Sequence, residues 1–123
     1  MKTLAQIRAA NALRWKDHKF GGQKGGEVVS GFPMLIKTGG LLTAAAFAVE
    51  WKDKEKDQRK HKGEFDVVRA VAEHLSSPII KITKSTEPDG LVRELAEAQD
   101  HSQLRRATAE AIGFLNYLKR FVA

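Results

Sequence analysis

The segment that most constrains the fold is residues 41–51, LLTAAAFAVEW, which directly follows Gly39 and Gly40. It contains no glycine or proline and is rich in alanine and leucine, which predicts a helix. Its apolar side chains point in almost every direction, and only Thr43 and Glu50 are polar. We therefore expect a core helix that other helices surround on most sides. At about 1.5 Å per residue, the segment is too short to cross a bilayer.

Composition and charge indicate one folded, basic domain over residues 1–123. Apolar residues make up 42% and charged residues 29%, as in ordinary soluble proteins, and the absence of cysteine excludes disulfides and thiolate metal sites. Arg8 and Arg14 interrupt the apolar positions of the amino terminus, unlike a signal peptide, so we expect a cytoplasmic protein. The net charge of +6 favours a polyanionic partner, nucleic acid before an anionic membrane, and we expect no membrane partner.

Hydrophobic periodicity predicts further helices around this segment, over residues 2–20, 27–38, 64–75, 86–98 and 102–122. Gly31 and Pro33 favour a kink or a late start of the second helix near Phe32. Flexible loops are predicted near residues 21–26 and 52–63, and residues 79–83 form an extended linker because a lone strand is unstable. The predicted fold class is all-α: a compact single-domain bundle of about five to six helices around a buried central helix.

Residues that could support catalysis or hold a cofactor are not grouped in the sequence. The glycine-rich loop GGQKGG lacks the spacing of a phosphate-binding loop, so we interpret it as a connector whose Lys24 reaches a backbone phosphate. The four histidines are scattered, which argues against a metal site, and His74 is expected on the solvated side of its helix. Four acids are interpreted as solvated helix-surface groups: Glu64, Asp66, Glu94 and Glu97. We therefore expect no catalytic residues, no metal, no cofactor and no enzymatic activity.

The last predicted helix carries the clearest functional signal. Its polar side bears four cations with no acid among them: Arg105, Arg106, Lys119 and Arg120. Solvated helix faces usually mix both signs, so this side suits a row of phosphates. Acidic groups of a partner protein could use the same face, and we favour phosphate.

The first predicted helix aligns Arg8, Trp15 and Lys19 in one stripe, where Trp15 could stack on a base or belong to the core; we favour the core. The complete set of residues that we predict to contact RNA spans three helices and comprises Arg14, Lys16, Lys19, Lys37, Arg105, Arg106, Lys119 and Arg120.

Two motifs resemble one known family. The first runs from FPMLI at residues 32–36 through GGL at 39–41 to AAF at 45–47, and the second joins ATAEA at 107–111 to LNYLKRF at 115–121. Together they resemble the small helical subunit of the type III-B (Cmr) CRISPR effector complex. This chain departs from the family pattern at Gly39, where Asn is usual, at Tyr117, where Trp is common, and at Val122, which separates Phe121 from the final alanine. These departures leave the fold intact and put the surface chemistry in question.

The resemblance implies a non-catalytic helical protein whose copies stack head to tail along the complex. There they would steady guide RNA and target RNA through sequence-independent backbone contacts, in antiviral defence, beside the other subunits. The alternative hypothesis is a helical protein–protein adaptor with a basic docking face and no RNA contact.

Overall fold

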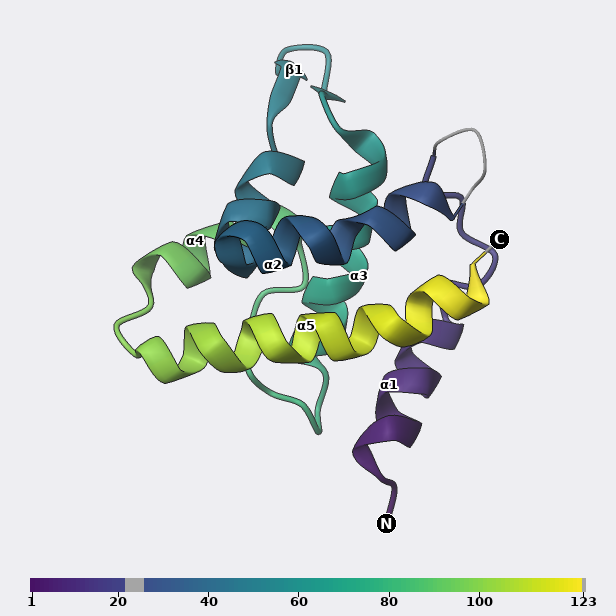
Figure 1. The fold of residues 1–123 in the computed structure, drawn as a ribbon. Helices are drawn as coiled ribbons and strands as arrows, with labels where there is room; N and C mark the ends of the chain where they lie inside the picture. Colours follow the sequence, from purple (N-terminus) through teal and green to yellow (C-terminus); the bar gives the residue numbers. More distant parts are fainter. Residues whose placement is uncertain (22–25, 123) are drawn as a thin grey trace.

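Five α-helices and one short β-hairpin make up residues 1–21 and 26–122, the part of the chain that the computed structural model describes (Figure 1). In chain order they are α1 (Leu4–Leu13), α2 (Glu27–Ala48), β1 (Trp51–Asp53), β2 (Gln58–Arg59), α3 (Lys62–Ser76), α4 (Pro88–Glu97) and α5 (His101–Phe121). The prediction of a compact helical bundle is confirmed. Residues 22–25 of the predicted connector, Lys24 among them, lie outside the described residues.

A sharp bend within α2 lies at Gly40, directly before the alanine-rich segment. Gly40 has φ 84° and ψ 168°, a backbone conformation that glycine reaches without steric cost. The bend frees the N–H of Leu41, which donates to Oγ1 of Thr108 on α5 at 3.3 Å. The predicted late start near Phe32 is wrong, because α2 begins at Glu27 and continues through Pro33.

The alanine-rich segment is less buried than its composition predicts. Its helix ends at Ala48, so the predicted continuation to Trp51 is wrong, and Thr43, Ala46 and Phe47 are exposed. Small alanine side chains are tolerated on either face of a helix, so an alanine-rich run does not identify its buried side.

The central helix is α3. Nine of its 15 residues are buried, and it contacts each of the other four helices and β2. Asp66 and His74 are among the buried residues, so the prediction that both face solvent is wrong. Asp66 instead accepts hydrogen bonds from Nζ of Lys62 at 2.6 Å and Nε2 of His18 at 3.0 Å.

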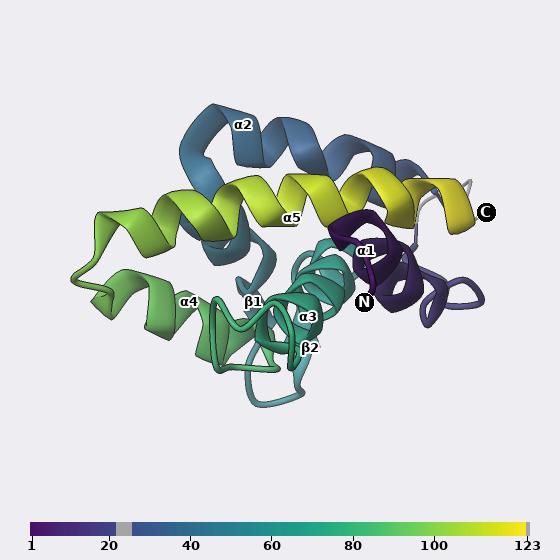
Figure 2. The same ribbon diagram turned by 90° about the horizontal axis from the view of Figure 1, so that it is seen from below.

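The helices are arranged with α2 and α5 side by side, as both views show, and with α3 beneath them (Figure 2). In these views α1 lies near the carboxyl-terminal end of α5 and α4 near its amino-terminal end. Among the described residues, α2 is the one helix long and apolar enough to span a membrane. In this fold it packs instead against α3, α4 and α5.

A β-hairpin occupies the charged run where we predicted a flexible loop near residues 52–63, and that prediction is wrong. The antiparallel strands are held by Arg59, whose guanidinium lies 3.4 Å from the centroid of the Trp51 ring. Arg59 also donates to the carbonyl of Val49 at 2.7 Å and to both carboxylate oxygens of Asp89 at 3.1 and 2.7 Å. One arginine therefore ties the hairpin to the end of α2 and to α4.

The other boundaries differ from the predictions by local contacts. The first helix ends at Leu13 and continues as turns, within which Trp15 is half-buried against the core, as favoured above. No strand forms at residues 79–83, in agreement with the prediction. Glu94 is not simply solvated, because its carboxylate accepts the backbone N–H groups of Lys84 and Ser85 at 3.0 Å and so fixes the connection before α4.

Candidate nucleic-acid interface

The helix α5 presents a cationic face because one side of it is fixed in the core. Asp100 caps its first turn by accepting the N–H of Ser102 at 2.8 Å. Five apolar side chains are fully buried along the opposite side: Ala107, Ala111, Phe114, Leu115 and Leu118. Because these positions share one side of the helix, the side chains on the opposite side are directed outward.

Four cations occupy that outward face and are exposed: Arg105, Arg106, Lys119 and Arg120. They form two pairs, one near each end of the helix. Lys119 lies 13 positions after Arg106, which corresponds to about 20 Å along the axis. Exposed Asn116 lies between the pairs. The predicted cationic face therefore consists of two pairs of cations, spaced widely enough to contact separate phosphates of one strand.

None of these four side chains is in an ion pair or a side-chain hydrogen bond with another described residue. The ion pairs of the described chain lie elsewhere, and the carboxylate nearest to this face in sequence, Glu110, is buried. Lys119 and Arg120 also lie in the last turn of α5, where positive charge complements the helix dipole. The face therefore carries four unopposed charges that an external polyanion can reach.

Glu110 belongs to a polar cluster that joins α1, α3 and α5. Its carboxylate accepts two hydrogen bonds from Arg8, at 2.7 and 2.8 Å, and one from Nε2 of His74 at 2.9 Å. The Nδ1 atom of His74 accepts from the side-chain amide of Asn11 at 2.9 Å, and the imidazole stacks on Phe114 with centroids 4.4 Å apart. Every polar atom of the imidazole has a partner within the protein.

Burial of the Glu110 carboxyl raises its pKa, but the hydrogen bonds from Arg8 and His74 and the positive charge of Arg8 outweigh that effect and lower the pKa to about 2. The same hydrogen bond from Arg8 raises the pKa of its guanidinium. Although His, Glu and Arg are common catalytic residues, the His74 side chain has no exposed surface. This cluster holds three helices together.

The chain matches one family model, described as CRISPR-associated protein (Cas_Cmr5), over residues 4–123. It belongs to the Cas_Cmr5 family. It is therefore a CRISPR-associated subunit of the type III-B (Cmr) complex, and other subunits of that complex are its partners. No curated protein and no solved structure matches the chain.

Within this Cas_Cmr5 family member, the motif residues serve mainly the fold. Phe32, Ile36 and Ala45 of the first motif are buried, and Gly40 makes the bend. The second motif combines buried residues of α5 with the exposed Lys119 and Arg120. The motifs therefore identify the family chiefly through its core.

The other four residues predicted to contact RNA lie on different elements from α5. Arg14 caps the carboxyl end of α1 and is exposed, Lys16 and Lys19 are exposed in the turns that follow, and Lys37 is exposed on α2. The structure thus places all eight predicted residues at the surface and gathers only the four of α5 on one helix face.

The sequence analysis missed the buried cluster of Arg8, Asn11, His74 and Glu110. One signal was available: Glu110 lies three residues after Ala107 and four before Phe114, both on the buried side of α5. A carboxylate in that position needs a buried partner. The identity of the partner, 102 residues away on α1, could not be read from spacing within one helix.

In this family member, metal ligands are not grouped either. Within residues 1–21 and 26–122, no group of three or more histidine or acidic side chains could hold a metal ion.

Proposed function

We propose that this protein is a non-catalytic, cytoplasmic subunit of the type III-B effector complex that steadies guide RNA and target RNA through the backbone. Copies of the chain stack head to tail beside the other subunits, and the complex acts in antiviral defence. The single observation that carries the RNA contact is the set of four exposed, unopposed cations on α5.

Two properties of this face favour a phosphate backbone over base edges. Guanidinium and ammonium groups bind phosphate oxygens, which carry no sequence information. The two cation pairs lie about 20 Å apart on a rigid helix, so they can bind negatively charged groups that are separated by a similar distance. In an RNA-guided complex, base pairing supplies the sequence recognition and protein contacts need only the backbone.

The experiment that tests this proposal is charge reversal of three residues: Arg105→Glu, Arg106→Glu and Arg120→Glu. In the reconstituted complex we expect weaker retention of target RNA, because three phosphate contacts become repulsive. The slope of log K against log salt concentration should become shallower by about 2, since each contact to single-stranded RNA releases about 0.7 counterions. The retention is measured by filter binding between 50 and 300 mM salt.

The hairpin supplies a matched control with the same change in charge. Its control substitutions are Lys52→Glu, Lys54→Glu and Lys56→Glu, at exposed positions on another part of the surface. Circular dichroism checks that both triple variants keep the wild-type helix content. If both variants lose RNA equally, or if the α5 variant retains RNA with an unchanged salt slope, the assignment of this face is wrong.

The alternative is the adaptor, in which the α5 face binds acidic groups of a partner protein and never contacts RNA. The same triple variant distinguishes the two. If the protein is an adaptor, the triple variant should lose its protein partner whether or not the RNA has been digested with ribonuclease. If the protein contacts RNA, the triple variant should keep its protein partners and lose only the RNA.

A further inference from the structure

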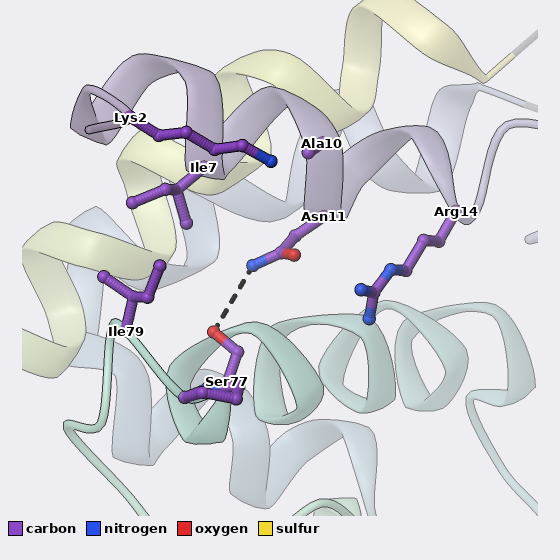
Figure 3. A pocket seen from close by; sticks show the side chains of 8 residues that line it. Lys2, Ile7, Ala10, Asn11, Arg14, Ser77 and Ile79 are labelled. Carbon is purple, nitrogen blue, oxygen red and sulfur yellow. Dashed lines mark hydrogen bonds between the residues drawn. The ribbon is translucent and has the colours of Figure 1, made fainter.

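A hollow of about 190 Å³ lies between α1 and the chain that follows α3 (Figure 3). Its walls are aliphatic: Ile7 and Ala10 come from α1, and Pro78 and Ile79 come from the α3–α4 connection. Figure 3 shows Ile7 and Ile79 facing each other across the opening. Ile79 is 68% exposed, which leaves most of a large aliphatic side chain in water at the edge of a concave apolar surface.

Polar groups lie within the hollow, but most of their hydrogen-bonding capacity is used inside the protein. The side-chain amide of Asn11 donates to Oγ of Ser77 at 3.3 Å and also contacts Nδ1 of His74. The Ser77 hydroxyl in turn donates to the carbonyl of His74 at 2.7 Å. These contacts hold the floor of the hollow rigid and leave little with which to recognise the polar edge of a ligand.

Two cations flank the hollow, Lys2 from the amino-terminal side of α1 and Arg14 from its carboxyl end. Both are exposed, and within the described residues neither is in an ion pair. An aliphatic hollow with a positive charge on each side is complementary to an apolar side chain that has carboxylates nearby.

The size and lining of the hollow decide between kinds of occupant. At about 190 Å³ it is smaller than the sites that hold cofactors and drug-sized ligands, which measure roughly 300–1,000 Å³. No aromatic ring lines it, whereas proteins that bind unpaired bases stack them on aromatic side chains. A single aliphatic side chain, inserted as interface anchors are, fits both observations.

We propose that this hollow receives one aliphatic side chain from an acidic segment of another subunit of the Cmr complex, with carboxylates of that segment pairing with Lys2 and Arg14. The proposal rests on membership of the complex and is independent of the RNA contact at α5. The proposed partner of Arg14 is therefore a carboxylate of another protein, whereas the sequence analysis predicted that Arg14 contacts RNA.

The first test compares two exposed aliphatic residues in the reconstituted complex. Ile79→Asp places a carboxylate at the hollow, and Met34→Asp makes the same kind of change on α2, at a residue that is 66% exposed. We expect Ile79→Asp to lower incorporation of this subunit into the complex at least tenfold and Met34→Asp to leave it unchanged. Equal incorporation of both variants, or equal loss, would overturn the proposal.

The second test identifies the occupant in the intact complex. A photoreactive amino acid replaces Ile79 in one sample and Met34 in another, and the crosslinked product is mapped by mass spectrometry. We expect position 79 to crosslink to a partner segment with an aliphatic residue and at least two Asp or Glu within four positions of it. A crosslink to RNA, to a segment without acids, or no crosslink at all would overturn the proposal.

A third test asks whether the crosslink at position 79 depends on the two cations beside the hollow and is independent of the α5 face. Lys2→Glu with Arg14→Glu should reduce the crosslink at position 79 at least tenfold, whereas Lys54→Glu with Lys56→Glu, at exposed positions of the hairpin, should not; equal reduction would contradict the pairing. The triple α5 variant should lose RNA and keep this crosslink. Failure of the RNA proposal and failure of this one are therefore seen in different measurements.

Discussion

Removing the charge of Glu110 tests the buried cluster most directly. In Glu110→Gln the side chain keeps its size but loses its charge and one acceptor oxygen. An amide oxygen at the Oε2 position still accepts from Nε of Arg8 and Nε2 of His74, but the amide N–H group is then brought toward Nη2 of Arg8. Loss of one partner of a buried ion pair typically costs about 3–5 kcal/mol of unfolding free energy. Arg8 is 25% exposed, so water solvates part of its charge, and we expect a loss of about 2–3 kcal/mol at pH 7.

The pH dependence gives a second, independent magnitude. The pKa of Glu110 is lowered from its ordinary value of 4.5 to about 2, so the carboxylate stabilises the folded state by roughly 3 kcal/mol above pH 4.5. This stabilisation is present above the unfolded-state pKa and is lost as the pH falls toward the folded-state pKa. Roughly 2 kcal/mol should therefore disappear between pH 5 and pH 3 in the wild-type protein and not in Glu110→Gln.

The assay is urea denaturation followed by circular dichroism at pH 7, 5, 4 and 3. Glu97→Gln is the control, because Glu97 is exposed and has no ion pair in the described structure. It removes the same charge and should change the unfolding free energy by less than about 0.5 kcal/mol. If Glu110→Gln is equally mild, or if its stability falls in parallel with that of the wild type from pH 5 to pH 3, the explanation of the lowered pKa is wrong.

Three further predictions concern the backbone and the assembly. Gly40→Ala should lower the unfolding free energy by about 1–2 kcal/mol, because φ is 84° at this position. Gly31→Ala, in regular helix with open space around it, should raise the unfolding free energy by about 0.5 kcal/mol. Both are measured by urea denaturation, and equal effects would contradict the bend. Gly113→Ala should destabilise by about 1–3 kcal/mol because its Cβ would lie 2.6 Å from Cζ of Arg8, and near-neutral behaviour would show that α1 adjusts freely. The free protein should sediment as a monomer, because head-to-tail contacts form an open array that needs its template, and stable dimers at micromolar concentration would argue against this.

Features set by local sequence were predictable. The bend at Gly40 follows from two glycines between apolar runs, and the outward position of Arg105 and Arg120 follows from the long periodic pattern of α5. In both cases one helix contains all the information, since the 3.6-residue repeat fixes which side chains share a face.

Features that depend on distant partners were not predictable. Alanine contributes too little area to show which side of residues 41–48 is buried. The sequence analysis therefore predicted this segment, and not α3, as the central helix. The charged run around residues 52–62 forms a hairpin because Arg59 packs on the Trp51 ring and binds the Asp89 carboxylate. The run has no alternation of apolar residues from which these contacts could be predicted. His74 was assigned to solvent because its partner Glu110 lies on another helix.

The bond between Arg8 and Glu110 also determines when this protein can finish folding. The two residues are 102 positions apart, and α1 packs chiefly on α5, the described helix farthest from it in the sequence. During synthesis α1 must wait without its main partner until α5 has been translated, and closing so long a loop slows folding relative to bundles of consecutive helices. Early translation stops would therefore release chains with an undocked amino-terminal helix, which are substrates for chaperones and proteases.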